Sequence, residues 1–210
     1  MEDFSYWKNR KIDDERRDWQ GNSKTWLQGY WDSAFHCHRN QLVKELSKLK
    51  FNSLLEIGCN VGANISRISS EFNIEDNDLA GIDINEDAIQ FAQKKMPDVL
   101  FRIGNILERL PFENKSYDIV LADAVLMYVE PEKIDFVLDE MNRVAKKAII
   151  LCDWDKEENG ERIKDFHWCY NYKFLLEKFG FKVNKIKITK WPTKSGNWER
   201  NGWIFVAARQ

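Results

Sequence analysis

The chain has 210 residues, of which 43% are hydrophobic and 31% charged, a balance typical of one globular domain. Its formal net charge of −2 argues against a nucleic-acid partner, because binding to phosphates usually leaves a basic excess. No apolar run approaches the roughly 18 residues of a membrane span, and the first residues lack a signal-peptide pattern. The four cysteines include no CxxC pair, which argues against a zinc ribbon and favours a reducing, cytoplasmic location.

Short apolar strands alternate with amphipathic helices through the middle of the chain. The predicted strands are 53–57, 79–84, 99–103, 117–123 and 147–153, and the predicted helices between them are 61–72, 85–96 and 131–145. Strands that alternate with helices predict βαβ units, a parallel sheet and right-handed crossovers.

Both ends of the chain depart from this alternation. After residue 153 the pattern predicts a helix at 166–180, then strands at 181–189 and 203–209 that pair antiparallel because no helix separates them. Residues 40–49 predict an amphipathic helix, and residues 1–31 are polar and aromatic without a clean period. The simplest organisation is one domain, 1–210, in which residues 1–50 form a helical extension and residues 51–210 form the core.

A glycine-rich turn follows the first predicted strand. Residues 54–64 read LLEIGCNVGAN, and a strand-to-helix turn of this kind lets the backbone approach a ligand. Asp83 ends the next strand, where a carboxylate can accept hydrogen bonds from both hydroxyls of a ribose. Asn105 follows the third strand, where its amide can read a purine edge. The three strand ends together predict a ligand that contains a nucleoside.

The turn also departs from the dinucleotide fingerprint G-x-G-x-x-G, because it reads E-x-G-x-N-x-G. Asn60 stands where a glycine is expected, and asparagine tolerates the left-handed backbone better than other non-glycine residues. The carboxylate of Glu56 is poorly placed beside a pyrophosphate. It is well placed near a ligand that carries an ammonium group.

At this point the chain resembles a known family. LLEIGCNVGAN, GIDIN, IGN and SYDIVLADAVLMYV look like the successive motifs of the class I S-adenosylmethionine-dependent methyltransferases, over residues 50–153. The resemblance implies an α/β, Rossmann-like fold: a seven-stranded, mostly parallel sheet with an antiparallel last strand and helices on both faces. CNVG and the stretch LPFENKSYDIVLADAVLMYV are also similar to methylases associated with pseudaminic acid biosynthesis.

The resemblance further implies the cofactor S-adenosyl-L-methionine and the product S-adenosyl-L-homocysteine. The residues that it assigns to cofactor binding are Glu56, Gly58, Cys59, Asn60, Gly62, Asp83, Ile84, Asn105, Ile106 and Asp123. Among these, Asp83 would hold the ribose, Ile84 would pack on the adenine and Asn105 would bond its edge.

Methyl transfer from a sulfonium needs orientation first, and a general base only when the acceptor is an alcohol or a protonated amine. Asp123, at the end of the fourth strand, is a candidate to hold an amine or take a proton, and a helix or turn cap is the alternative. His36 and His167 are the other candidate catalytic residues. No metal site is expected at His36 and His38, because two histidines one residue apart on a helix point to different faces.

Four aromatic or acidic residues are candidates for substrate contact: Tyr128, Asp153, Trp154 and Trp31. A core position for Tyr128 and a surface turn for Asp153 and Trp154 are the structural alternatives. Nine tryptophans lie within residues 7–31, 154–168 and 191–203, and none within 32–153. They predict either a lid formed by the N-terminal segment over the substrate side of the cleft, or packing of that segment on the last hairpin.

The function predicted from the sequence is methyl transfer to an O or N atom of a small molecule. A methyltransferase acting on a protein or RNA would need a basic or extended docking surface, and only short clusters such as RKIDDERR are present. Loss of Asp83 or of the glycines of the turn would favour a non-catalytic binding module, and the sequence keeps all of them. A nicotinamide dehydrogenase lacks its fingerprint here. No particular oligomeric state is predicted.

Overall fold

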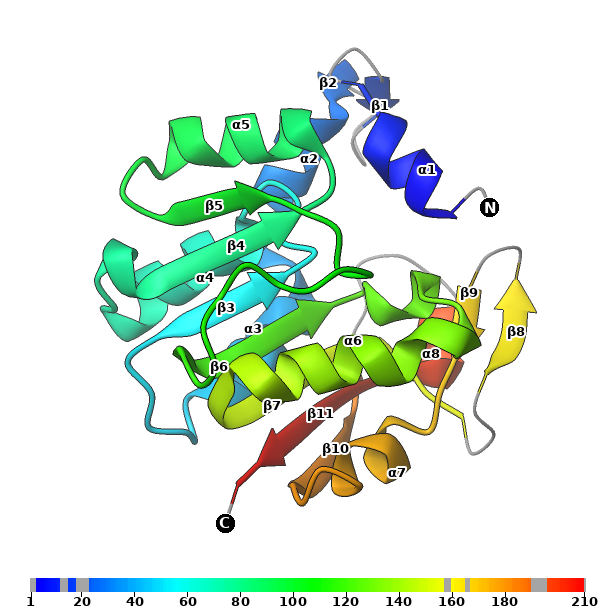
Figure 1. Ribbon diagram of the computed structural model, residues 1–210. Coiled ribbons are helices and arrows are strands. Elements are labelled where there is room, and N and C mark those ends of the chain that lie inside the picture. The colour runs from blue at the N-terminus through cyan, green and yellow to red at the C-terminus, as the bar shows by residue number, and fades with distance from the viewer. Residues whose placement is uncertain are drawn as a thin grey trace.

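The computed structural model describes residues 3–11, 15–17, 23–156, 160–164, 167–189 and 196–209 (Figure 1). Its central sheet has seven strands: β3 (Leu54–Ile57), β4 (Leu79–Asp83), β5 (Leu100–Ile103), β6 (Tyr117–Asp123), β7 (Ala145–Trp154), β10 (Lys182–Lys187) and β11 (Gly202–Ala208). They lie in the order β10-β11-β7-β6-β3-β4-β5. Strands β3 to β7 run parallel, and β11 runs antiparallel to both β10 and β7. The predicted Rossmann-like fold is thereby confirmed.

Helices cover both faces of this sheet, because alternate residues of each buried strand point to opposite sides. Leu55 and Ile57 pack under α6 (Pro131–Val144) and α7 (Tyr172–Glu177). Leu54 packs on the opposite face, in the cluster that includes apolar residues of α3 (Cys37–Leu46), α4 (Ala63–Phe72) and α5 (Glu86–Lys95). Figure 1 shows the two helical layers in front of and behind the sheet.

The N-terminal extension combines helices with a short ribbon. It contains α1 (Asp3–Asn9), the antiparallel strands β1 (Glu15–Arg17) and β2 (Ser23–Thr25), α2 (Trp26–Asp32), a 3-10 turn η1 (Ser33–Phe35) and α3. The hydroxyl of Thr25 accepts a hydrogen bond from Gln28 N at 3.3 Å and so begins α2. Trp26 and Leu27 are fully buried, which anchors α2 on the core.

Two secondary-structure predictions after residue 153 were wrong in part. The predicted helix 166–180 is replaced at its start by β9 (His167–Cys169), which pairs antiparallel with β8 (Glu161–Lys164), and only α7 is helical. The prediction failed because residues 167–169 pair with β8, and the pattern of residues 166–180 alone does not reveal a pairing with another segment. The predicted loop 191–201 contains the helix α8 (Gly196–Asn201). The predicted antiparallel pairing of the last two strands is confirmed, and Trp19 and Trp191 lie outside the described residues.

No helix in the described part of the chain is both long and apolar enough to cross a membrane.

Candidate active site

The glycine-rich turn between β3 and α4 adopts left-handed backbone conformations at three positions. The φ angles are 65° at Gly58, 50° at Asn60 and 77° at Gly62. A Cβ atom at Gly58 would lie 2.4 Å from Cγ2 of Val125, so this site also needs glycine for space. Asn60 accepts a hydrogen bond from Val61 N through its own side chain at 2.9 Å, a local bond that suits asparagine. The turn therefore brings bare backbone to the carboxyl end of β3.

The closeness of Val125 to Gly58 predicts that adding one methyl group at Gly58 will destabilise the fold strongly. Gly58→Ala is expected to lower the free energy of unfolding by about 2–5 kcal/mol, from the left-handed backbone and the clash with Val125 together. Gly180→Ala is the matched control, because Gly180 has φ 77° and no heavy atom lies within 4 Å of the place its Cβ would take. The control should lose only the backbone part, about 1–2 kcal/mol. Urea unfolding of both variants measures the difference, and equal losses would contradict the clash.

Asp83, at the end of β4, ties this turn to the neighbouring loop. One carboxylate oxygen accepts a hydrogen bond from Asn60 N at 2.8 Å, and the other accepts from Asn85 N at 2.9 Å. Burial raises the pKa of the Asp83 carboxyl, and these backbone hydrogen bonds oppose the rise. Because each oxygen has a second lone pair, the carboxylate retains acceptor capacity for hydroxyl donors.

The other predicted cofactor residues lie on the same edge of the sheet. Ile84 follows Asp83 and is half-buried, and Ile106 is 5% exposed in the core cluster beside β4. Asn105 is half-buried, and its side-chain oxygen accepts a hydrogen bond from Leu107 N at 3.0 Å. Cys59 is 3% exposed, and burial raises the pKa of its thiol well above the usual value. The three strand ends are adjacent because β3, β4 and β5 are neighbours.

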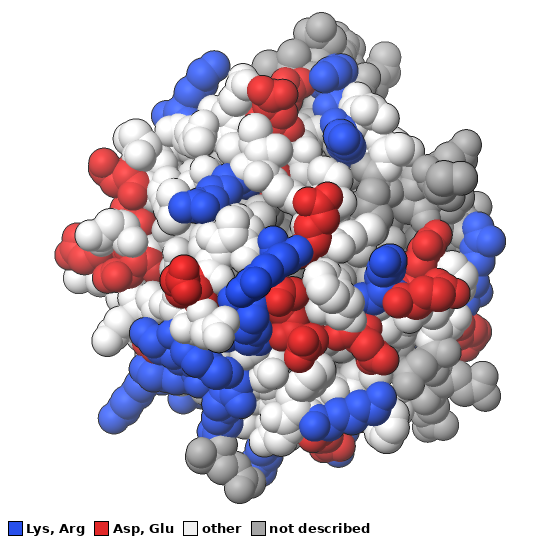
Figure 2. All heavy atoms as spheres, in the orientation of Figure 1, with Lys and Arg blue, Asp and Glu red and all other residues white. Residues whose placement is uncertain are grey.

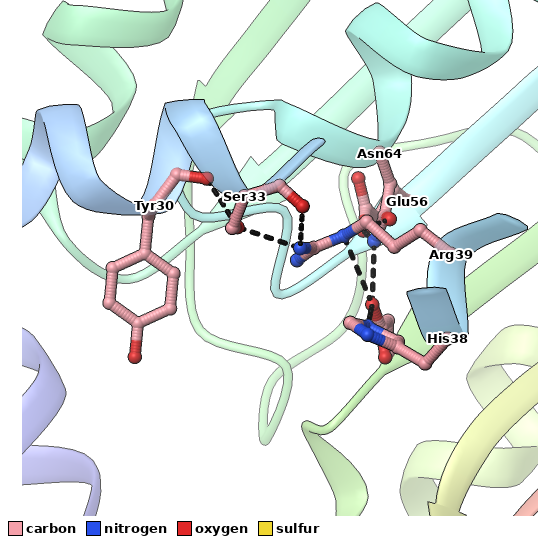
Figure 3. A network of polar contacts seen from close by, with 7 residues as sticks. Tyr30, Ser33, His38, Arg39, Glu56 and Asn64 are labelled. Atoms are coloured by element: carbon pink, nitrogen blue, oxygen red, sulfur yellow. Dashed lines mark hydrogen bonds and ion pairs between the residues drawn. The ribbon is translucent and has the colours of Figure 1, made fainter. Parts of the chain in front are cut away.

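A buried polar network crosses the ends of β3 and β6 (Figure 3). The amide nitrogen of Asn64 donates to Glu56 at 2.6 Å and to Asp123 at 3.0 Å, so one side chain of α4 bridges two carboxylates. Arg39 donates from Nε to the Asn64 oxygen at 2.6 Å and lies 3.6 Å from the Asp123 oxygen. His38 Nε2 lies 3.3 Å from the same Asp123 oxygen. The N-terminal helix α3 thus supplies two basic groups to the acid at the end of β6, and Asn64 links that acid to Glu56.

The two acids have opposite pKa shifts. Burial raises the pKa of Glu56 to about 8, against the opposing effect of the Asn64 hydrogen bond and with a further rise from Asp123. Burial acts in the same direction on Asp123, but the charge and hydrogen bond of His38, the charge of Arg39 and the hydrogen bond of Asn64 outweigh it and lower the pKa well below its usual value. At neutral pH, Asp123 therefore carries the negative charge of this pair and Glu56 holds a proton.

Sequence reasoning missed the basic partners of Asp123. The named candidate His36 is exposed at the N-cap of α3, and it is His38 that lies against the acid, with a side chain 4% exposed. The helical spacing of His38 with the buried Leu42 was the available signal for an inward-facing position. Its partner is 85 residues away, so that contact has no local signature.

Three aromatic side chains form a wall at the ends of β6 and β7. The ring of His167 stacks on Trp154 with centroids 5.1 Å apart and an interplanar angle of 29°, and it lies 4.9 Å from the ring of Tyr128. Trp154 is 4% exposed, whereas Tyr128 and His167 are half-buried. These residues come from β7, β9 and the 3-10 turn η3 (Leu126–Tyr128). We call Tyr128, Trp154 and His167 the ring wall.

The two remaining substrate candidates occupy different surroundings. Asp153 is 1% exposed, and its carboxylate accepts hydrogen bonds from Met127 N at 3.1 Å and from Trp154 N at 2.8 Å. Burial raises its pKa to about 7, against these backbone bonds. Asp153 thus supports the turn that carries Tyr128. Trp31 lies against α5, with its ring centroid 6.1 Å from that of Phe91.

Known proteins similar to this chain include methyltransferases. A family model described as a methyltransferase domain matches residues 54–148. An uncharacterized protein of Methanocaldococcus jannaschii is 30% identical over 198 residues, covering 81% of this chain and 91% of the relative. The tRNA N(3)-methylcytidine methyltransferase Mettl2 of Drosophila melanogaster is 29% identical over 148 residues, covering 58% of this chain and 45% of that enzyme.

Among solved structures, the magnesium protoporphyrin IX methyltransferase of Synechocystis PCC 6803 with bound S-adenosylhomocysteine matches with a TM-score of 0.64 and 16% identity over 90% of each chain. That likeness concerns the fold. The chain belongs to the class I S-adenosylmethionine-dependent methyltransferase superfamily and is an enzyme. Its cofactor is S-adenosyl-L-methionine.

The residues on the carboxyl edge of the sheet fit this cofactor. The turn at Gly58 has no room for a side chain, and Asp83 offers acceptor capacity at the next strand end. One oxygen of Glu56 and one of Asp123 are buried without a hydrogen-bond partner among the described residues. Buried polar atoms of this kind normally have a partner, and a ligand with an ammonium group would provide one. When bound, the cofactor supplies a methyl group already activated on a sulfonium.

Proposed function

We propose that this enzyme transfers a methyl group to an O or N atom of a small molecule, and that the acceptor lies against the ring wall. The observation that carries the proposal is the position of Tyr128, Trp154 and His167 at the ends of β6 and β7, on the same edge of the sheet as Asp123, the last residue of β6. Figure 2 shows acidic side chains over much of the face in view and one cluster of basic side chains at its lower left. The formal net charge of −2 favours a small acceptor over a polyanion.

The cofactor contacts follow from the strand ends. Asp83 accepts the ribose hydroxyls, Ile84 packs on the adenine, and Asn105 bonds the adenine edge with Ile106 beside it. The backbone from Gly58 through Cys59 and Asn60 to Gly62 lines the methionine part. The Asp123 carboxylate holds its ammonium group by charge, and an oxygen of the Glu56 carboxyl group accepts a hydrogen bond from it, supported by the Asn64 bridge between the two side chains.

Asp123 orients charge in this proposal and does not take a proton. Its depressed pKa makes it a weak base, because a general base works best when its pKa lies near the operating pH. His167 is half-buried between two rings of the wall, an arrangement that favours a packing role. The preferred acceptor is therefore a group that is already nucleophilic, such as a neutral nitrogen.

Residues 1–50 act as a lid on the core of residues 51–210 in this proposal. Three contacts support it: α3 reaches Asp123 through His38, the ring of Trp7 lies 5.6 Å from that of Tyr128, and Trp26 is fully buried. A lid excludes water around the reacting methyl group. We place the reaction in the cytoplasm, where the free thiols of the four cysteines are stable.

His167 gives a test of the ring wall. His167→Phe retains a stacking ring and should keep KM for the acceptor within a few-fold of the native value. His167→Ala removes two ring contacts, each worth about 0.5–1.5 kcal/mol, and should raise KM by about tenfold or more. Steady-state kinetics over a range of pH measures both. If His167 were the base, His167→Phe would instead lose about 10²–10⁴-fold in kcat and change the pH profile. The same substitutions at His36 test the other candidate base.

A second candidate acceptor is a nucleobase in RNA. It is favoured by the similarity to the Drosophila tRNA methyltransferase, and rings of the kind found in the wall can stack on bases. Methyl-labelled S-adenosylmethionine, incubated separately with total RNA and with a small-molecule extract, distinguishes the two. Label in the small-molecule fraction supports our proposal. Label confined to RNA, in a reaction suppressed by salt, would replace it with the second candidate.

A further inference from the structure

Asn85 joins the ribose side of the cofactor site to the N-terminal segment. It caps α5, where its side-chain oxygen accepts a hydrogen bond from Ala88 N at 2.8 Å. Its side-chain nitrogen donates to the backbone oxygens of Trp7 at 2.6 Å and of Arg10 at 2.8 Å. Capping the helix needs only the side-chain oxygen, so the side-chain nitrogen is available to bind the N-terminal segment. Asn85 is 1% exposed, so its bonds to Trp7 and Arg10 are shielded from water.

These bonds place residues 7–10 across the end of β3. Asn85 follows β4, while the ring of Trp7 contacts the ring of Tyr128, which follows β6. In the sheet, β4 and β6 are the two neighbours of β3, and β3 leads into the glycine-rich turn. A segment that touches the loops after both neighbours passes over the strand between them. Figure 1 shows α1 beyond the carboxyl ends of these strands.

Arg10 anchors the other side of the same segment. Its guanidinium carbon lies 4.5 Å from the ring centroid of Trp26, 5.7 Å from those of Tyr6 and Trp7, and 5.9 Å from that of Tyr30. Such cation–π contacts hold the end of α1 against α2, whose Trp26 is fully buried. The segment is therefore fixed by α2 at one side and by Asn85 at the other.

Asn85 is also bonded to the ribose acid. Its backbone N–H donates to Asp83, and the other oxygen of that carboxylate accepts from Asn60 N in the glycine-rich turn. One chain of hydrogen bonds thus runs from the turn through Asp83 and Asn85 to the N-terminal segment. A ligand held by Asp83 lies beside the bonds that hold residues 7–10.

We propose that Asn85 is a positioning residue that clips residues 7–10 over the bound cofactor, so that release of the product S-adenosylhomocysteine requires its two bonds to Trp7 and Arg10 to break. This proposal extends the lid proposed above, because it names Asn85 as the side chain that holds the N-terminal segment over the cofactor. It rests on the cofactor contacts and is independent of the methyl acceptor.

The side-chain chemistry of Asn85 allows a selective test. Asn85→Asp keeps an oxygen to cap α5 but replaces the donor nitrogen with an acceptor that faces two carbonyl oxygens. Asn85→Ser also keeps a cap and removes the donor without adding charge next to Asp83. Both variants are expected to release S-adenosylhomocysteine about 10- to 100-fold faster, since two buried hydrogen bonds are lost. Stopped-flow tryptophan fluorescence measures this dissociation rate in the full-length protein.

Hydrogen exchange and a matched cap separate the clip from a general loss of structure. In both Asn85 variants the amides of residues 7–11 should exchange faster, while those of β3 and β4 keep their protection. Asn171 caps α7 by accepting from Phe174 N, so Asn171→Asp makes the same chemical change at another helix cap. An unchanged dissociation rate in Asn85→Ser overturns the proposal. An equal acceleration in Asn171→Asp, or loss of protection in β3 and β4, overturns it as well. If the native protein did not bind S-adenosylhomocysteine, the proposed cofactor contacts would be wrong. That result differs from an unchanged dissociation rate, which contradicts the clip alone.

Discussion

Asp83→Ala is expected to weaken binding of S-adenosylmethionine by about a hundredfold or more. Each hydrogen bond between a hydroxyl and a charged carboxylate contributes about 1.5–3 kcal/mol, and the ribose would lose two. The substitution also removes the acceptor for Asn60 N and Asn85 N, so the glycine-rich turn and the clip lose a shared anchor. Isothermal calorimetry on the native and variant proteins, well below both melting temperatures, measures the change in affinity.

Asp78→Ala is the matched control for Asp83. Asp78 is exposed and lies just before the opposite, amino end of the same strand, so its removal deletes one negative charge without touching the cofactor edge. Its affinity for S-adenosylmethionine should equal that of the native protein. Equal affinities in Asp83→Ala and the native protein would remove Asp83 from the cofactor site.

Glu56 is expected to make the cofactor-free protein less stable as the pH rises. Its pKa is about 8 in the native fold, against an ordinary value of 4.5 that applies to the unfolded chain. Below pH 4.5 both states hold the proton, so the residue has no effect on the pH dependence. Between these two pKa values the unfolded chain alone releases it, and the free energy of unfolding falls by about 1.4 kcal/mol per pH unit. Above pH 8 the native state ionises too, and the loss levels off.

Glu56→Gln should remove this pH dependence while keeping an acceptor for Asn64. The variant is therefore expected to gain stability over the native protein as the pH rises from about 5 to about 8, reaching several kcal/mol, on the order of 4–5. Urea unfolding without cofactor measures the difference at each pH. Asp123 and Asp153 contribute equally to both proteins and cancel to first order. Glu75→Gln, at an exposed position, controls for the loss of one charge. A pH-independent difference would show that Glu56 is already ionised in the native protein.

The middle of the central sheet could be predicted because its strands contain uninterrupted apolar runs. Residues 119–122 of β6 and 148–152 of β7 are buried on both faces, and that burial is what the sequence pattern reflects. The turn at Gly58 could also be located, since glycine and asparagine mark left-handed backbone. In each case a property of adjacent residues decides the structure.

The contacts that could not be predicted join distant segments. The β8–β9 hairpin depends on pairing between Glu161 and Cys169, and the intervening sequence gives no strong turn signal for it. Asn85 could be recognised as a helix cap, but its bonds to Trp7 and Arg10 cross more than seventy residues. For the same reason the bridge from Asn64 to Asp123 had no counterpart in any local pattern.

The dependence of the strand-end acids on Arg39 has a consequence for how the enzyme is made. A ribosome completes α3 before Asn64 and Asp123 exist, so Arg39 lacks its full set of partners until β6 has been synthesised. Arg39 also donates to the backbone and hydroxyl oxygens of Ser33, which keeps it oriented from within the N-terminal segment. A chain begun at residue 51 would carry Asp123 into the core without either basic partner, a loss that typically costs about 3–5 kcal/mol. The N-terminal segment therefore cannot be exchanged freely between relatives. A chimeric protein would need Ser33, His38 and Arg39 to come from the same parent protein as Glu56 and Asp123.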